Sequence, residues 1–360
     1  MGRPLSQRYA YLRQVTRTST LAQPMRALVV TNMHPTSARP ALGRFVADQV
    51  EALRRIEGVE VELFAFPPGL RSYPRAAREL RRRYRGERFD VVHAHFGLTA
   101  WPALVVRGAP HVVTFHGTDL AHPRSGRLSR AALRFVDLTA TVSASLARER
   151  IAGAGVHRRV AVLPCGVDLA RFRPLPRAEA RVRLGLDPDA PCLLFPADPA
   201  RAEKRFDRAR ELAGDVQLLT LGDVHPDEVP LWVNAANTVL VPSEREGFGL
   251  AVLEALACDV PVLATPVGVA LLALAGIEGA HCAPFDAAAC RAALAPHLAA
   301  ADPRVAGRAR AELFSADRMA ERVVVAWRAL AAESGEASRT RGYTRRRGAV
   351  RAGNAASPDR

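Results

Sequence analysis

Short apolar runs alternate with longer segments of helical apolar spacing along most of the chain. Apolar runs of about four to eight residues indicate buried strands, whereas apolar residues recurring roughly every three or four positions indicate amphipathic helices. Two series of alternating strands and helices, beginning near Arg26 and Cys192, predict an α/β protein of two Rossmann-like βαβ domains facing across a cleft. The expected strands lie at 26–31, 59–64, 90–94, 110–115, 137–142, 160–163, 192–197, 216–221, 238–241 and 261–264.

The same pattern separates the domains from their flanking segments. Both ends of the chain are polar, basic and poor in apolar residues, so we expect them to be disordered. The segment between the domains is rich in proline and arginine and reads as a linker. The expected division is 1–24 (disordered extension), 25–175 (first domain), 176–190 (linker), 191–315 (second domain), 316–332 (terminal helix) and 333–360 (basic disordered tail).

The clearest unit runs from residue 238 to residue 268 as strand, glycine-containing loop, helix and strand. Its loop follows the carboxyl end of a strand, where open α/β sheets bind ligands. Gly247 and Gly249 permit close approach of the backbone, and the free N–H groups of the following helix favour an anion. Glu246 and Glu254 flank this helix start, and carboxylates accept hydrogen bonds from hydroxyl groups. The unit therefore predicts a ligand that carries both phosphate and sugar hydroxyls.

The run Glu246-Gly-Phe-Gly-Leu-Ala-Val-Leu-Glu254, followed by Pro-Val-Leu-Ala-Thr-Pro-Val-Gly, resembles the E-x7-E signature of the group 1 (family 4) retaining glycosyltransferases, which have the GT-B fold. The resemblance extends over residues 25–332. An ordinary βαβ unit with solvated glutamates is the alternative interpretation of the same residues.

The resemblance implies a nucleotide-diphosphate sugar as co-substrate, with no other cofactor and no metal ion. Glu254 would hold the ribose hydroxyls and Glu246 the hydroxyls of the donor sugar. The terminal helix would cross back to the first domain. The residues implied to hold the diphosphate through their backbone are Gly247, Phe248, Gly249 and Leu250.

Further positions match the family pattern. His116, in the run Thr-Phe-His-Gly-Thr-Asp, corresponds to a histidine that faces the donor sugar. Gly43 opens the first βα turn, where the family usually has a glycine pair, although Arg44 follows here. Lys204 and, from a shifted position, Arg201 correspond to the cations that grip the diphosphate. A structural histidine and solvated loop cations remain the alternative interpretation of these residues.

Three departures from the pattern occur, of which the first is expected only to pack at the border of the cleft and the other two to alter donor preference or weaken activity. Cys165 replaces an asparagine, Asp259 occupies a position that is commonly glycine, and Val269-Ala-Leu-Leu replaces a second glycine and a glutamate after Gly268. Two further histidines lie near the expected site in the sequence. We expect His93 to be packed in its strand and His95 to line the cleft.

The net charge of +15 is concentrated in the two ends and in residues 71–88, where eight arginines stand against two glutamates. Apolar residues of this stretch, among them Tyr73, Ala76 and Leu80, fall on one helical face. A basic amphipathic helix can lie on an anionic membrane surface, and a solvated arginine-rich helix is the alternative. Nucleic acid is not an expected partner, because no recognised binding module is present.

The remaining composition is typical of a cytoplasmic protein, peripheral at most to the inner face of the membrane. No apolar run approaches the length of a membrane span, and the five cysteines lack C-x-x-C spacing. The leading hypothesis is a metal-independent, retaining glycosyltransferase of envelope or extracellular polysaccharide or glycolipid synthesis, with a glycan or lipid-linked acceptor. The alternatives are a non-catalytic nucleotide-binding or scaffold protein of the same fold and a basic surface-binding protein.

Overall fold

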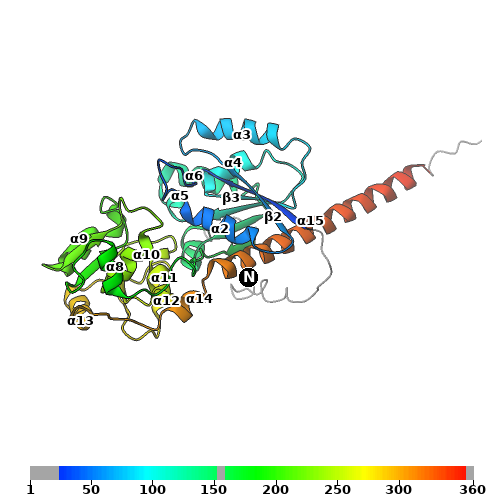
Figure 1. The fold of residues 1–360 in the computed structure, drawn as a ribbon. Helices are drawn as coiled ribbons and strands as arrows, with labels where there is room; N and C mark the ends of the chain where they lie inside the picture. The colour runs from blue at the N-terminus through cyan, green and yellow to red at the C-terminus, as the bar shows by residue number, and fades with distance from the viewer. Residues whose placement is uncertain (1–23, 152–158, 354–360) are drawn as a thin grey trace, which may run out of the picture.

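The computed structural model describes residues 24–151 and 159–353. The predicted disorder of residues 1–24 falls almost wholly outside the described residues, as does that of residues 354–360. Two lobes, each built on one sheet, are joined at one side by the long helix α15 (Figure 1). The prediction of an α/β protein with two Rossmann-like domains is confirmed.

The first domain contains a six-stranded parallel sheet in the order β2-β1-β3-β4-β5-β6. Its residues alternate between the two faces, and each face packs on helices, as expected for a doubly wound sheet. Leu28 and Val30 of β1 point to the side of α3, α4 and α6, whereas Ala27 and Val29 point to α2 and α15. The strands are β1 Met25–Thr31, β2 Val59–Ala65, β3 Val91–His95, β4 His111–Phe115, β5 Leu138–Thr141 and β6 Arg159–Val162. The helices are α2 Arg44–Arg54, α3 Ser72–Arg83, α4 Ala100–Ala103, α5 Thr118–Ala121, α6 Pro123–Ala132 and α7 Ala144–Leu146.

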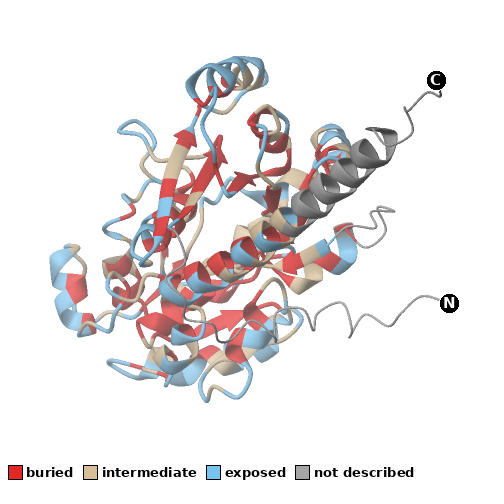
Figure 2. Ribbon diagram, turned by 90° about the vertical axis from the view of Figure 1, so that its right-hand side faces the viewer, coloured by how far each residue is buried: buried red, intermediate tan, exposed pale blue. Residues whose placement is uncertain are grey.

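The second domain contains a five-stranded parallel sheet in the order β11-β10-β9-β7-β8. Leu193 and Leu240 pack against α9 and α13, and Leu194 and Val239 pack on the side of α10 and α11. Buried residues are accordingly concentrated in the two sheets and on the inner helix faces (Figure 2). The strands are β7 Cys192–Phe195, β8 Gln217–Thr220, β9 Thr238–Val241, β10 Val262–Ala264 and β11 His281–Cys282. The helices are α8 Arg177–Arg183, α9 Phe206–Ala213, α10 Val229–Ala235, α11 Leu250–Ala257, α12 Ala270–Leu274, α13 Ala287–Ala299 and α14 Arg308–Glu312.

The terminal helix α15 (Ala316–Gly353) leaves the second domain and packs under the first sheet. Its apolar residues Met319, Val323 and Trp327 lie in the core of the first domain, as the amphipathic pattern predicted. The helix continues well beyond residue 332, so the expected disorder of the basic tail is not found in residues 333–353. Arginine is the commonest residue in this part of the sequence, and it favours helix even without an apolar stripe.

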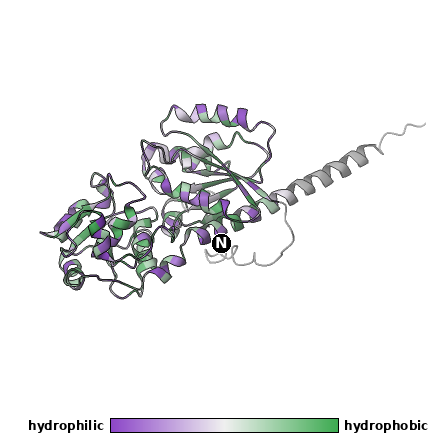
Figure 3. Ribbon diagram, viewed as in Figure 1, coloured by the Kyte–Doolittle hydropathy of each residue, from purple (hydrophilic) through white to green (hydrophobic). Residues whose placement is uncertain are grey.

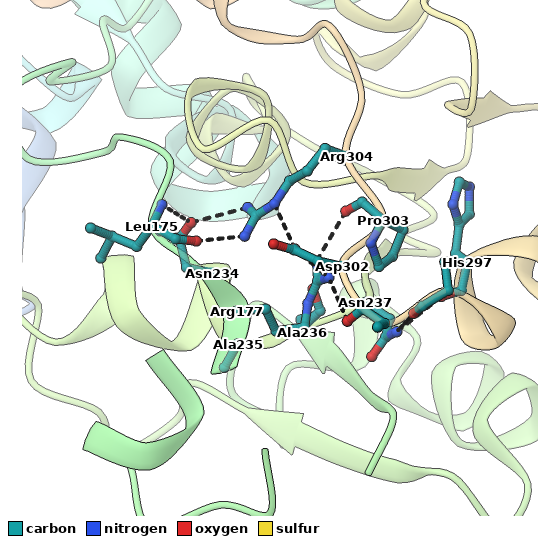
Figure 4. Close-up of polar contacts among 12 residues, drawn as sticks. Leu175, Arg177, Asn234, Ala235, Ala236, Asn237, His297, Asp302, Pro303 and Arg304 are labelled. Carbon is teal, nitrogen blue, oxygen red and sulfur yellow. Dashed lines mark hydrogen bonds and ion pairs between the residues drawn. The ribbon is translucent and has the colours of Figure 1, made fainter. Parts of the chain in front are cut away.

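The expected linker is packed firmly onto the second domain, because α8 carries two buried arginines. Arg177 and Arg181 are only 1% and 2% exposed. The Arg177 guanidinium donates to the carbonyl oxygens of Ala236 (3.1 Å) and Pro303 (3.0 Å) and to the carboxylate of Asp302 (2.6 Å) (Figure 4). Burial lowers the pKa of Arg177 to about 10, which still leaves it charged at neutral pH. Buried arginines therefore fasten the interdomain segment.

Arg177→Leu is expected to destabilise the second domain by about 3 kcal/mol, because it leaves buried carbonyl groups without a donor. Arg183→Leu is the matched control, since Arg183 lies on the same helix, is half exposed and makes only a 3.7 Å ion pair with Glu179. Urea unfolding followed by circular dichroism measures both variants. Equal stabilities of the two variants would contradict the fastening role.

Candidate functional site

Loops that follow neighbouring strands meet at the facing edges of the two sheets. In the second domain β7 lies between β8 and β9, so the segments after β7 and β9 diverge at a topological switch point, the usual ligand site of such sheets. The segment after β7 forms the short helix η4 (Ala202–Lys204), and the segment after β9 leads into α11. In the first domain the neighbouring strands β1, β3 and β4 lead to Gly43, His95 and His116.

Lys204 and Glu246 form an ion pair that joins these two segments of the second domain. The Lys204 Nζ lies 2.7 Å and 2.6 Å from the two carboxylate oxygens of Glu246. The Ser243 hydroxyl donates to the same carboxylate at 2.8 Å. The side chains of Lys204 and Glu246 are only 15% and 8% exposed, so water screens this pair weakly. The structure thus brings two of the predicted site residues into direct contact.

Arg201 takes a different position from Lys204. Its guanidinium donates to Glu203 at 2.7 Å within the same loop, and its side chain is 47% exposed. Arg201 borders the cavity described below, and its ion pair is with Glu203, not with Glu246. Of the two predicted cations, Lys204 is the one paired with Glu246, and Arg201 is the one that lines the cavity.

The loop before α11 needs glycine at particular positions. Gly249 has φ +92°, in the left-handed region that favours glycine, and it is the residue from which α11 begins. No side chain caps this helix, so the backbone amides of its first turn are available to a ligand. Phe248 is buried against Phe314, and its carbonyl accepts from the Val269 N–H at 2.6 Å. The amides predicted to hold a diphosphate therefore sit on a supported loop.

The same loop touches the first domain directly. A Cβ atom on Gly247 would overlap with the carbonyl oxygen of His116, and one on Gly117 would lie 3.0 Å from the Gly247 Cα. The loop containing Glu246 and the loop containing His116 are therefore in backbone contact. This contact is compatible with glycine at 247 and with no larger residue.

His116 follows β4 and is held by Asp119. The Asp119 carboxylate accepts hydrogen bonds from the backbone N–H groups of Gly97 (3.1 Å), His116 (3.2 Å) and Gly117 (2.9 Å). Burial raises the pKa of Asp119 to about 6, against the opposing effect of these N–H groups. Asp119 belongs to the motif that pointed to His116, but the sequence did not show that it shapes the His116 loop.

The start of α2, which follows Gly43, packs beside the His116 ring. Gly43 precedes α2 with φ +64°, and a Cβ atom there would overlap with the Met33 carbonyl. The Phe45 ring, in the first turn of α2, lies 4.9 Å from the His116 ring. Arg44 reaches Asp227 of the second domain at 3.6 Å, so the start of α2 borders the space between the domains.

Glu254 lies in the second turn of α11 and faces two charged residues that the sequence did not indicate. Asp48 of α2 accepts from the Arg171 guanidinium at 2.8 Å, and both lie close enough to Glu254 to affect its pKa. Burial raises the pKa of Glu254 to about 7, with Arg171 lowering it and Asp48 raising it. Near neutral pH Glu254 can therefore be either a carboxyl group or a carboxylate.

A cavity of about 1130 Å³ lies between the domains, beside these residues. Both domains and α15 contribute to its wall, so it is an interdomain site. Leu271 and Leu272, which stand where the family pattern usually has a glutamate, are exposed and line it. Other lining residues are Gly117, Thr118, Ser143, Arg201, Glu246, Gly247, Gly268 and Arg322.

The other two departures from the family pattern have local structural roles. Asp259 has φ +54°, and its carboxylate accepts from the N–H groups of Gly307 (3.0 Å) and Arg308 (2.8 Å). It therefore fastens α14 at the end of α11 opposite to Gly249, and the expectation that it affects the donor site is not supported. Burial raises the pKa of the Cys165 thiol to about 12, so this thiol is protonated at neutral pH.

The arginine-rich helix α3 does not present an apolar face to solvent. Ala76 and Leu80 are buried, and Tyr73 stacks edge-on to Phe66 at 5.5 Å. Its arginines are exposed, and most of the helix has a hydrophilic colour in Figure 3. The apolar face expected to meet a membrane instead packs on the domain.

Neither a membrane-spanning helix nor a metal-binding cluster is found in the part of the chain that the structure describes. Residues 24–151 and 159–353 contain no helix that is both long and apolar enough to cross a bilayer. The described part of the chain also contains no group of three or more histidine, cysteine, aspartate or glutamate side chains placed to hold a metal ion.

The two facing Rossmann-like domains, joined by a returning terminal helix, define a GT-B fold. Solved structures agree: a sucrose-phosphate synthase from Thermosynechococcus elongatus has a TM-score of 0.62 at 20% identity, over 89% of this chain and 100% of its own. Anabaena HepE, in complex with UDP and glucose, has a TM-score of 0.63 at 16% identity, over 85% of this chain and 100% of its own.

Sequence comparisons give the family. A model of Glycosyltransferase Family 4 matches residues 22–171, and one of Glycosyl transferases group 1 matches residues 179–299. A D-inositol 3-phosphate glycosyltransferase of Geodermatophilus obscurus is 30% identical, over 69% of this chain and 68% of that protein. The corresponding protein of Frankia alni is 32% identical, over 53% of this chain and 61% of its own length. The chain thus spans about six-tenths of the Frankia relative, and it belongs to the group 1, family 4 glycosyltransferases.

Proposed function

We propose that this protein transfers a sugar from a nucleotide-diphosphate sugar to an acceptor hydroxyl, with retention of configuration and without a metal ion. The observation that carries the proposal is the Lys204–Glu246 ion pair, placed beside the uncapped start of α11 and in contact with the His116 loop. Family membership gives independent support.

The charges of the site suit departure of a diphosphate. Lysine has three N–H donors, and the two short contacts to Glu246 leave one for a phosphate oxygen. Lys204 and the first-turn amides of α11 would oppose the negative charge that grows on the leaving group. In the transfer, the bond from the anomeric carbon to the diphosphate breaks and a bond to the acceptor oxygen forms. The acceptor proton passes to the departing diphosphate, so charge and atoms balance.

We assign Glu254 to the ribose hydroxyls and Glu246 to the hydroxyls of the donor sugar. Glu254 lies one helical turn inside α11, near the expected diphosphate, and carboxylates accept hydroxyl hydrogen bonds. His116 and Gly43 would border the donor sugar and the acceptor from the first domain.

The acceptor is proposed to be a glycan or lipid-linked sugar of envelope or extracellular polysaccharide or glycolipid synthesis. The names of the relatives introduce a second candidate, an inositol phosphate. Arg148 and Arg322 line the cavity and could neutralise a phosphorylated acceptor. Release of free nucleotide in the presence of inositol 3-phosphate, compared with undecaprenyl-linked sugar, would separate the two acceptors.

Any association with a membrane is proposed to be electrostatic, through the exposed arginines of α3. Binding to vesicles containing anionic lipid should then weaken steeply with salt. Loss of charge at Arg78 and Arg82, both exposed, should abolish it. Binding that is unchanged by these substitutions would remove α3 from the proposal.

The decisive experiment measures thermal stability of the full chain with UDP, GDP, ADP and their sugar conjugates. A ligand present at about one hundred times its dissociation constant should stabilise the fold by about 2.7 kcal/mol. One base should give a clear shift, and Glu254→Ala should abolish it. Absence of any shift with well-folded protein would favour the non-catalytic scaffold instead.

Nucleotide affinity is expected to rise with pH through about pH 7. The pKa of Glu254 is raised to about 7, so the carboxylate that accepts two hydroxyl hydrogen bonds predominates only above that pH. Calorimetric titration between about pH 6 and 8 should show affinity increasing severalfold. Affinity rises with pH for two reasons, ionisation of Glu254 and ionisation of the nucleotide phosphate. Glu254→Gln should remove the first contribution and keep the second. An unchanged pH profile in the glutamine variant would contradict the assignment.

A further inference from the structure

Three histidines lie in a row from the core of the first domain to the loop that borders the interdomain cavity. The ring centroids of His93 and His95, two residues apart on β3, are 4.7 Å apart with planes 25° apart. His95 Nδ1 lies 3.0 Å from His116 Nε2, and the two ring centroids are 5.3 Å apart, as expected when both nitrogens point at each other in the planes of their rings. His93 and His95 are fully buried. The expectation that His95 lines the cleft is therefore wrong, since His95 lies behind His116.

The tautomer at the inner end of the row follows from its partners. The Trp327 indole N–H can only donate, and it lies 3.1 Å from His93 Nδ1. His93 Nδ1 is therefore the acceptor, and its proton is on Nε2, which donates to the Thr114 hydroxyl at 2.7 Å. The terminal helix α15 thus fixes both the orientation and the protonation of His93, against which His95 packs.

All three imidazoles are neutral at physiological pH. Burial lowers the pKa of His95 to about 3 and lowers the pKa values of His93 and His116 well below the usual range. Each histidine in the row therefore carries one ring proton, and its position is set by the hydrogen bonds that the ring makes.

The environment of His95 Nε2 determines which of the two ring nitrogens of His95 carries the proton. His95 Nε2 is buried and has no hydrogen-bond partner among the described residues. A proton on Nε2 would be an orphaned buried N–H donor, whereas an unprotonated Nε2 is an under-used acceptor, which proteins tolerate better. The proton of His95 therefore belongs on Nδ1, from which it is donated to His116 Nε2.

We propose that His95 is a positioning residue that fixes His116 as the Nδ1–H tautomer, so that the second ring nitrogen of His116 is an N–H donor, next in the chain to Gly117 of the cavity wall. His116 Nε2 is occupied as an acceptor, so the proton of the neutral ring must lie on Nδ1. His116 Nδ1 makes no hydrogen bond with the described side chains, and the residue is half-buried, whereas His93 and His95 are fully buried.

This tautomer limits what His116 can do. An N–H donor can bind a sugar oxygen and stabilise negative charge on it, but it cannot accept a proton as a general base. His116 would therefore act as a hydrogen-bond donor in the transfer reaction. That role rests on the proposed function, whereas the tautomer itself does not.

The tautomer is read from long-range ¹H–¹⁵N correlation spectra of the full chain with ¹⁵N-labelled histidine, at about pH 7. The His116 signals are assigned by their loss in His116→Gln. We expect Nδ1 protonated and Nε2 unprotonated at His116, and Nε2 protonated at His93. A protonated Nε2 at His116 would overturn the proposal, and this measurement needs neither substrate nor a variant of His95.

Two variants test the positioning role. His95→Asn can supply an amide N–H to His116 Nε2, whereas His95→Leu is similar in size and supplies none. If donor transfer is detected, the leucine variant should lose about tenfold to a hundredfold in kcat with KM little changed, and the asparagine variant should retain most activity. Equal losses in both variants, with His93 signals intact, would overturn the positioning role. If the spectra show the expected tautomer but no donor is ever turned over, the proposed function fails and the tautomer assignment stands.

Discussion

Lys204→Met is expected to reduce kcat/KM for sugar transfer by about a hundredfold to a thousandfold, mainly in kcat. Lys204 is the cation held within the site by Glu246, and its charge would oppose the charge that grows on the diphosphate. Methionine keeps the length of the side chain and removes the charge. Steady-state release of free nucleotide measures the effect.

Arg201→Met is the matched control for this prediction. Arg201 lies in the same loop but is half exposed and paired with Glu203, so its loss should change kcat/KM by less than about tenfold. Lys204→Met also leaves the Glu246 carboxylate buried without its cation, which can lower stability. The double variant Lys204→Met/Glu246→Gln removes that buried charge. Recovery of activity in the double variant would assign the loss to folding and contradict the electrostatic role.

The part of the site that could be predicted from sequence is the part that is local in the chain. Glu246, Gly247, Gly249 and Glu254 lie within one loop and one helix, and spacing alone places them together. Lys204 was predicted from the family resemblance, and it reaches Glu246 because β7 and β9 are neighbours in the sheet. In each case one βαβ unit, or one pair of adjacent strands, fixes the geometry.

The residues that sequence reasoning missed are brought together by tertiary packing. Asp48 and Arg171 are 123 residues apart in the chain, and both approach Glu254 only when the domains face each other. The burial of His95 has the same origin, because His93, which hydrogen-bonds to Trp327 of α15, stacks on it. No periodicity in the sequence indicates such contacts.

The buried arginines of α8 show a second limit of the sequence. Arginine is rarely buried, so the arginine-rich segment before β7 was expected to be an exposed linker. Arg177 and Arg181 are nevertheless enclosed, because backbone carbonyls at the ends of other elements supply their acceptors. The acceptors belong to segments as far as 126 residues away, so composition could not reveal them.

Gly247→Ala is expected to reduce kcat/KM by about a hundredfold while leaving the folding of each domain nearly unchanged. Gly247 does not have a positive φ, so alanine causes no backbone strain there. Its methyl group would instead overlap with the His116 carbonyl and force the two loops apart. A misplacement of about 1 Å between groups that act on one substrate can cost about a hundredfold in rate.

Gly276→Ala is the control, because Gly276 lies in the same domain with φ +71° and has no atom near the position of an added Cβ. Gly276→Ala should lose a little stability and keep its activity. Gly247→Ala should keep its stability and lose activity. Small-angle X-ray scattering should show a larger radius of gyration for Gly247→Ala alone, since the domains can no longer close at this point. Wild-type activity and scattering in Gly247→Ala would mean that the contact between the Glu246 and His116 loops is not needed for transfer. The catalytic arrangement would then have to be one in which the domains stand further apart.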